Sequence, residues 1–107
     1  MANRLTGKIK YIDQFNADVS LASEGDPFII KKIIGLSATD GDTFEMEDND
    51  GNVLLSVTNS NGAADSFEVD FGNDGYNFGN KGVKIDVSDC TGMEGTDGTD
   101  AVWIYTL

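Results

Sequence analysis

The sequence predicts an all-β protein, an antiparallel β-sandwich with a jelly-roll-like arrangement of about seven to eight strands. The first observation is alternation, because apolar and polar residues exchange places with a period of two in several short segments. The second is a composition unsuited to helices: 13 of the 107 residues are glycine, and no segment keeps helical apolar spacing. The third is rhythm, since turn-forming residues separate the alternating segments at intervals of about ten to fifteen residues.

Three strands are expected in the N-terminal third. Residues 8–12 alternate after Gly7, and residues 18–21 form a short second candidate before a turn at residues 23–27. Residues 28–37 form the most apolar segment of the chain. Simple alternation divides this segment into two faces. The first face holds Phe28, Ile30, Ile34 and Leu36, and the second holds Ile29, Lys31 and Ile33.

A hairpin is expected next, over residues 43–47 and 53–57. Alternation places Phe44 and Met46 toward the core, and the return strand adds Val53, Leu55 and Val57 to the same face. The turn at residues 48–52 contains Asp-Gly, a pair suited to the positive φ angles of tight hairpins.

The remaining strands are expected at residues 66–71, 83–87 and 101–106. In the first of them Phe67, Val69 and Phe71 point inward and acidic residues point outward. The pattern Phe-Gly-Asn-x-Gly occurs at residues 71–75 and again at 78–82, too closely spaced for a solenoid repeat. It predicts a glycine-bent loop whose Tyr76 and Phe78 fold back onto the sandwich, and residues 91–100 predict an exposed mobile loop.

Length and composition bound the function. The chain is expected to form a single domain over residues 1–107. Its net charge of −12 argues against nucleic acid and anionic membranes as partners. Because the chain has no histidine, the Ser-His-Asp triad, the Cys-His pair and the HExxH zinc site are excluded. The sequence therefore predicts a protein that is not an enzyme.

Cysteine usage and the N-terminal residues indicate the compartment. Cys90 is the one cysteine, so no internal disulfide forms, and a small residue packed at a strand end is its expected role. Residues 1–15 lack the apolar run of a signal peptide, and no apolar stretch is long enough to cross a bilayer. A protein made in a cytoplasm, and used there or released by lysis, is expected.

Acidic clusters raise the question of calcium. An EF-hand alignment of the turn at residues 48–52 puts Met46 and Val57 where carboxylate ligands are needed. Asp40 with Asp42, or Asp97 with Asp100, remain as irregular oxygen sites, although Asp is also a favoured turn residue. No metal and no other cofactor is predicted.

Charge and aromatic residues are unevenly placed. Residues 1–32 hold five basic and four acidic residues, whereas residues 33–80 hold ten acidic residues and no basic one. This indicates either an ordinary solvated acidic surface or a near-neutral docking end with an acidic outer face. On the final strand, Trp103 and Tyr105 lie opposite the face of Val102, Ile104 and Thr106. Apolar residues on both faces predict either a buried central strand or an interface.

The order of these segments resembles the small β-sandwich virion proteins encoded in the structural gene clusters of tailed bacteriophages. The likeness covers nearly the whole chain and rests on strand and turn patterns. The segments that carry it are residues 31–36, Gly41-Asp42-Thr43-Phe44, the Asp-Gly-Asn hairpin, Val53-Leu54-Leu55, residues 67–72, residues 82–87 and residues 102–107.

The resemblance implies a capsid decoration (cement) protein on the outside of the virion. The implied partners are the major capsid protein and further copies of the chain, as a trimer or dimer. Residues 1–12 are interpreted as a capsid-contacting arm or as the first strand. The candidate interface residues are Arg4, Lys8, Lys10, Ile29, Ile33, Trp103 and Tyr105. The alternative is a small tail or head-fibre module that binds host-surface glycan through Trp103, Tyr105 or Tyr76.

Overall fold

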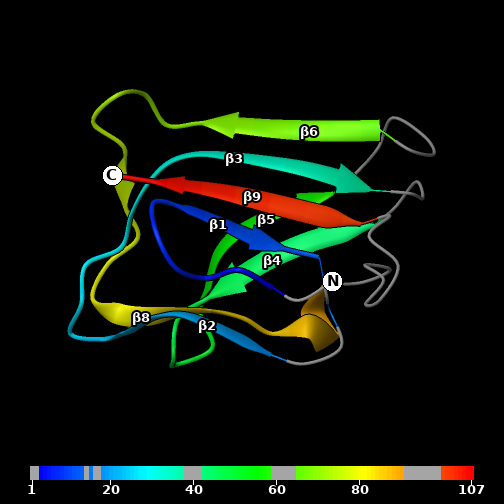
Figure 1. Ribbon diagram of the computed structural model, residues 1–107. Helices are drawn as coiled ribbons and strands as arrows, with labels where there is room; N and C mark the ends of the chain where they lie inside the picture. Colours follow the sequence, from blue (N-terminus) through cyan, green and yellow to red (C-terminus); the bar gives the residue numbers. More distant parts are fainter. Residues whose placement is uncertain (1–2, 14, 16–17, 38–41, 59–64, 91–99) are drawn as a thin grey trace.

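Nine strands in two antiparallel sheets and one short 3-10 helix make up the described part of the chain (Figure 1). The computed structural model describes residues 3–13, 15, 18–37, 42–58, 65–90 and 100–107. The elements are β1 (Ile9–Ile12), β2 (Val19–Glu24), β3 (Ile29–Ser37), β4 (Thr43–Glu47), β5 (Val53–Thr58), β6 (Asp65–Asp70), β7 (Tyr76–Asn77), β8 (Lys81–Ile85), η1 (Val87–Asp89) and β9 (Ala101–Thr106).

The strand order is that of a jelly roll. The five-stranded sheet runs β1-β9-β3-β6, with β7 paired to β3, and the four-stranded sheet runs β2-β8-β4-β5. With β7 set aside, the first strand pairs with the last, β2 with β8, β3 with β6 and β4 with β5. Such nested antiparallel pairs, rolled into two stacked sheets, define the jelly-roll sandwich. The predicted fold class is confirmed, and the two-residue β7 takes the number of strands above the seven to eight expected.

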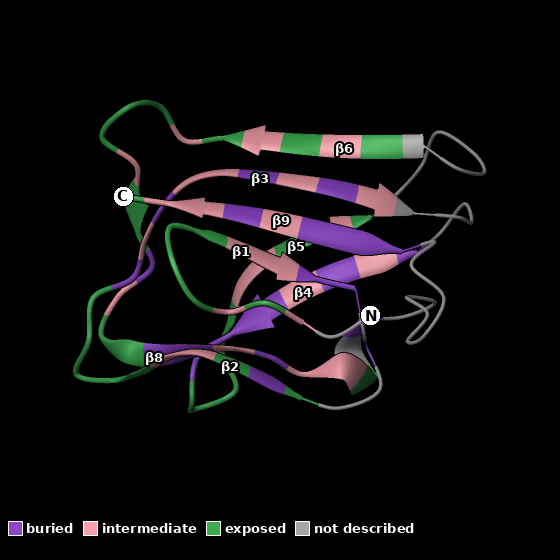
Figure 2. Ribbon diagram, viewed as in Figure 1, coloured by how far each residue is buried: buried purple, intermediate pink, exposed green. Residues whose placement is uncertain are grey.

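The core lies between the two sheets (Figure 2). Phe44 and Met46 of β4 are fully buried, as alternation predicts, and the Phe44 ring stacks on Phe67 of the opposite sheet at 6.5 Å between centroids. Gly35 makes room for that ring, because a Cβ there would collide with the Phe67 side chain. Phe67, Val69 and Phe71 contact the buried cluster, so the inward face predicted for β6 is confirmed.

The faces predicted for β3 are wrong beyond its first residues. A β-bulge in the pairing with β9, between Ile30 and Lys32, inserts an extra residue and reverses the alternation that follows. Ile30 and Ile33 therefore both point into the core, each with an exposed fraction of 0%. Ile34 points outward instead, where it lies opposite Trp103.

The β4–β5 turn is organised by Asp48. Its carboxylate accepts hydrogen bonds from the backbone N–H groups of Asp50 and Asn52, both at 2.9 Å, while Gly51 takes a φ of +86°. These bonds hold the pKa of Asp48 below its usual range, and the bond from the Asn52 N–H has the largest effect. Val53, predicted to point inward, is 56% exposed, because a bulge between Met46 and Glu47 shifts the pairing at this end.

The repeated Phe-Gly-Asn-x-Gly pattern forms two similar turns. Gly72 and Gly79 take φ angles of +86° and +104°, and each donates its N–H to the side chain two residues earlier. The rings of Phe71, Tyr76 and Phe78 contact one another at centroid distances of 4.9–6.0 Å. Phe78 is buried as predicted, and Tyr76 packs against it from a strand paired with β3 but stays 57% exposed.

The C-terminal third holds Cys90 and the long loop before β9. Cys90 is buried, and its thiol lies against the Glu45 backbone with Sγ at 3.4 Å from the amide nitrogen. This confirms a packed small residue. Residues 91–99 of the predicted mobile loop lie outside the described residues, and Asp100 at its end is buried. None of the described residues belongs to a helix long and apolar enough to span a membrane.

Candidate functional site

The outer face of the five-stranded sheet is rich in aromatic and aliphatic side chains. Cross-strand pairing aligns two rows on this face. The first row is Ile9, Tyr105, Lys32 and Asp70, and the second is Tyr11, Trp103, Ile34 and Glu68. These residues alternate with buried Ile12, Val102, Ile104 and Ile33. Because the solvent side of an antiparallel sheet is ordinarily polar, this face departs from the expected pattern.

The outer face of the four-stranded sheet follows that pattern. One outward row pairs Ser20, Lys84, Glu47 and Val53, and the next pairs Glu45 and Ser56. Glu47 is buried within its row, and Val53 at the edge of the sheet is the apolar member. No aromatic residue occurs among the strand residues of this sheet that alternate with the buried ones. The two sheets therefore share a core but present different surfaces.

Three aromatic rings form the floor of a groove on the five-stranded sheet. The Tyr11 and Trp103 rings lie 5.1 Å apart and are tilted by 45°. Trp103 and Tyr105 are half-buried, and Ile9, which also lines the groove, is 50% exposed. Together with Lys32, Ile34 and the flanking Arg4, Lys8 and Lys31, these residues make up what we call the groove face.

The first residues of the chain build one wall of the groove. Arg4 and Tyr11 exchange two backbone hydrogen bonds of 2.8 Å, which fold residues 3–6 back along β1. This places the Arg4 guanidinium over the Tyr11 ring, 4.9 Å from its centroid. Gly7, with a φ of +82°, permits the bend between the wall and β1.

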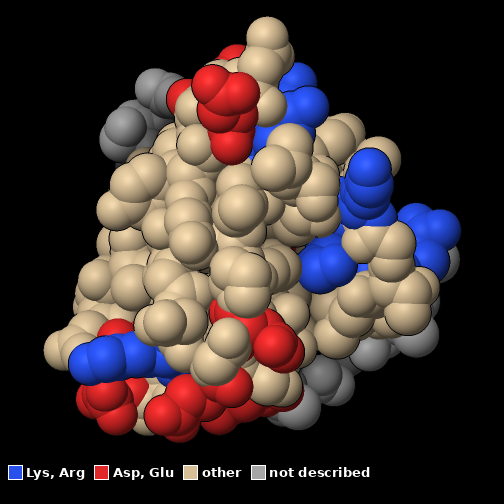
Figure 3. All heavy atoms as spheres, turned by 90° about the vertical axis from the view of Figure 1, so that its left-hand side faces the viewer, with Lys and Arg blue, Asp and Glu red and all other residues tan. Residues whose placement is uncertain are grey.

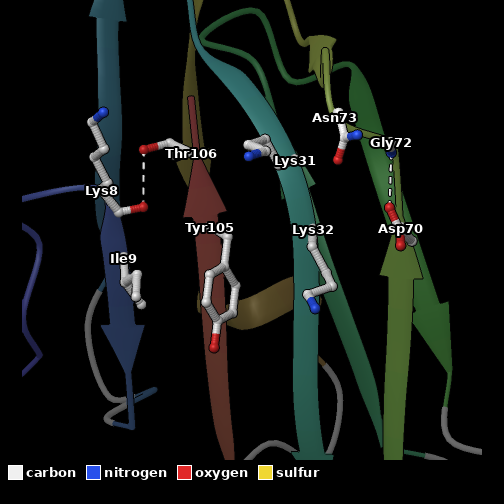
Figure 4. A pocket seen from close by; sticks show the side chains of 9 residues that line it. All are labelled: Lys8, Ile9, Lys31, Lys32, Asp70, Gly72, Asn73, Tyr105 and Thr106. Carbon is white, nitrogen blue, oxygen red and sulfur yellow. Dashed lines mark hydrogen bonds between the residues drawn. The ribbon is translucent and has the colours of Figure 1, made fainter.

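A smaller hollow of about 310 Å³ continues the groove toward β6 (Figure 4). Lys8, Lys31, Lys32 and Asp70 line it, with Tyr105 between Lys32 and Ile9. Lys32 Nζ lies 5.4 Å from the Tyr105 ring centroid. Within the described ranges, no ion pair joins any of the three lysines to a carboxylate, although the chain has 19 acidic residues. Asp70, opposite Lys32 in the β3–β6 pairing, is the acidic side chain that lies nearest to them in the lining of the hollow.

Charge separates the groove face from the rest of the surface. Arg4, Lys8, Lys31 and Lys32 are four of the seven basic residues in a chain of net charge −12. Figure 3 shows most basic atoms of that view along one flank and most acidic atoms at the lower end. The basic side chains of this flank therefore favour contact with carboxylates more than the acidic remainder of the surface does.

A buried carboxylate lies beside the Tyr11 phenol. Asp13, which carries it, is 1% exposed. Burial raises the pKa of the Tyr11 phenol, the neighbouring charge of Asp13 raises it further, and Arg4 lowers it. The Tyr11 hydroxyl therefore stays neutral near pH 7.

The structure brings together four of the seven residues expected at an interface. Arg4, Trp103 and Tyr105 line the groove, and Lys8 lines the adjoining hollow. Lys10 lies elsewhere, because its ammonium donates to the Gly7 carbonyl at 2.8 Å and lies over the Phe28 ring. Ile29 is half-buried against Gly75. Ile33 is in the core, so its assignment to an interface is wrong.

Sequence reasoning missed Tyr11, Lys31, Lys32 and Ile34. Alternation over residues 8–12 already places Tyr11 opposite the face of Ile12, and this was the available signal. No local pattern shows that β1 and β3 both pair with β9, and that pairing is what gathers these residues around Trp103.

Each acidic pair suggested for calcium has one member outside the residues that the structure describes. Asp40 and Asp97 lie outside the described residues, and Asp42 and Asp100 are buried. In the part of the chain that the structure describes, no three His, Cys, Asp or Glu side chains are grouped to hold a metal ion.

No family model, no curated protein and no solved structure matches this chain. The proposed function therefore rests on the residues of the groove face.

Proposed function

We propose that this protein is a non-enzymatic structural protein of a virus particle, of the capsid decoration type, which attaches to the shell through its groove face. The observation that carries the proposal is an aromatic, basic face on a protein that is otherwise strongly acidic. Aromatic residues and arginine are enriched at the centres of protein interfaces. The jelly roll recurs in viral capsid proteins and in lectins, which supports the proposal as analogy of fold alone.

The chemistry of the groove face defines the surface that it fits. Trp103 and Tyr105 offer half-buried rings that apolar side chains of a partner would cover. Lys8, Lys31 and Lys32 offer ammonium groups that carboxylates of the partner would pair with. The proposed partner surface on the major capsid protein is therefore apolar at its centre and acidic at its edge, and the acidic remainder of this chain faces water.

Glycan binding by a tail or head-fibre module would use the same rings as stacking platforms. The geometry favours this less, because Tyr11 and Trp103 are tilted by 45° and Arg4 covers the Tyr11 ring. Tyr76, the third candidate platform, is not among the residues that line the groove. A fibre module is distinguished by few copies per particle and by binding glycans when shells are absent.

The test is co-sedimentation of the purified chain with shells that lack it, counting bound copies as the protein is titrated. Lys8→Glu combined with Lys32→Glu reverses two charges on the groove face. Lys81→Glu combined with Lys84→Glu makes the same change in net charge on the four-stranded sheet. We expect many copies per shell, a roughly tenfold or greater loss of affinity for the first variant, and little change for the second.

Two results would overturn the proposal. One is failure of the unaltered chain to sediment with shells. The other is equal weakening by the two double variants, which would mean that net charge alone governs attachment.

A further inference from the structure

The four edge strands of the two sheets are not equally protected. An edge strand has unpaired backbone N–H and C=O groups along one side, and these can pair with another strand. Proteins block such edges with charge, proline, β-bulges, short strands or a covering segment. Apart from the two-residue β7, which pairs with β3 alone, the edge strands are β1 and β6 in the five-stranded sheet and β2 and β5 in the four-stranded sheet.

Three of these edges carry a recognisable block. The backbone of β1 is covered at Tyr11 by Arg4, which bonds to it in both directions. The outward side chains of β6 include Glu68 and Asp70. The strand β2 has a bulge between Ser20 and Ala22 and ends at Glu24. Each device discourages pairing with another strand.

The fourth edge, β5, is the least protected in the part of the chain that the structure describes, because its one device is a bulge at its start, opposite Met46 and Glu47. Its sequence is Val-Leu-Leu-Ser-Val-Thr, six residues with no charge and no proline. Its pairing with β4 is regular from Thr58 to Leu55. Val53, at its start, is one of the large apolar side chains that the described chain leaves exposed, at 56%. This edge has the features of a strand that pairs with another chain.

We propose that β5 pairs antiparallel with β5 of a second copy of this chain, which joins two four-stranded sheets into one. A second copy fits because the chain carries a net charge of −12, and β5 is an uncharged edge strand along which two copies meet without facing acids. Opposite residues in a ladder share a face, so odd positions must meet odd positions to keep Leu55 on the core side. With Ser56 on the two-fold axis, Leu55 lies opposite Val57 of the second copy on the core side, and exposed Val53 lies at the end of the shared ladder.

The geometry of such a dimer has a consequence for the groove face. The two-fold axis of a continuous antiparallel sheet runs perpendicular to that sheet. Both five-stranded sheets then lie on the same side, with their outer faces turned in the same general direction. A dimer built in this way meets a surface with two groove faces, although the inference about β5 does not depend on the proposed function.

The test is analytical ultracentrifugation of the purified chain, without shells, from micromolar to millimolar concentration. Val53→Lys places a charge on the β5 edge at an exposed position that the fold tolerates. Ile9→Lys is the matched control, since Ile9 is 50% exposed and begins a strand of the other sheet. We expect a concentration-dependent dimer for the unaltered chain and for Ile9→Lys, and a dissociation constant raised at least about tenfold for Val53→Lys.

Hydrogen exchange provides a second measurement on the unaltered chain. Amides on the free side of β5 should exchange more slowly as concentration rises, while amides of β6 should not change. A monomer at every concentration, or a dimer that survives Val53→Lys with unchanged β5 exchange, would overturn the inference. A dimer that ignores shells supports this inference and contradicts the proposed function, so the two can fail separately.

Discussion

The two sheets of this protein contribute to one core and yet meet the outside in different ways. The inward faces are equivalent, with Phe44 of one sheet stacked on Phe67 of the other. The outward faces are not, because one carries Trp103 and Tyr105 and the other carries serine, lysine and glutamate. Alternation makes this possible, since each strand can keep its inward residues while its outward residues change.

The difference teaches where to look for function in a fold that many unrelated proteins share. The four-stranded sheet shows what the outer face looks like when solubility is its main requirement. Compared with that face, the aromatic rings on the outer face of the five-stranded sheet indicate a role other than stabilising the fold. The contrast extends to charge, because the groove face gathers four of the seven basic residues.

The largest expected effect comes from the part that the sheets share. Phe44→Ala removes a fully buried ring between the sheets and should lower the free energy of unfolding by about 3–5 kcal/mol. Urea denaturation followed by circular dichroism measures the change. Phe44→Leu serves as the milder control, with a smaller loss expected. If Phe44→Ala costs less than about 1 kcal/mol, the sheets do not depend on a common core.

An intermediate effect separates the two faces. Trp103→Ala should weaken attachment to shells by roughly thirtyfold, equivalent to about 2 kcal/mol, because a central aromatic is removed from the interface. Glu45→Ala on the four-stranded sheet should leave attachment unchanged. The binding titration described above gives both values, with melting temperature as a check on folding. Equal effects of the two variants would remove the functional distinction between the faces.

The smallest effect concerns the pH dependence of stability and comes from Asp48 in the β4–β5 turn of the four-stranded sheet. The pKa of Asp48 is lowered in the folded state, so its charged form stabilises the fold above the unfolded pKa of about 4. That stability is lost as pH falls through the folded pKa. The melting temperature should therefore fall by a few degrees in acid, and Asp48→Asn should flatten this dependence. An identical acid slope in the variant would show that other carboxylates account for it.

Much of the strand layout is predictable from the sequence, since alternation is a local signal. The segment at residues 43–47 has the predicted limits, and so does the final strand at residues 101–106. The positions of β-bulges are not predictable in this way, because an inserted residue can be recognised only from the pairing with the partner strand. The bulge after Ile30 reversed the faces of Ile33 and Ile34, and the one after Met46 left Val53 exposed.

The candidate site is less predictable than the fold. Trp103 and Tyr105 are recognisable as outward residues from their own strand. Their neighbours are not, because Tyr11 and Lys32 approach them only through pairings that join β9 to β1 and to β3. The β1–β9 contact spans nearly the entire chain, and no pattern of period two encodes which distant strand is the partner.

The position of Trp103 makes the groove face visible to spectroscopy. Trp103 is the one tryptophan of the chain, and it lies half-buried with the Tyr11 ring at 5.1 Å. Its fluorescence therefore reports on the groove without any attached label. A molecule that covers the groove should shift the emission to shorter wavelength, whereas pairing along β5, in the other sheet, should leave the spectrum unchanged. One intrinsic fluorophore thus distinguishes occupation of the face from association of the chain.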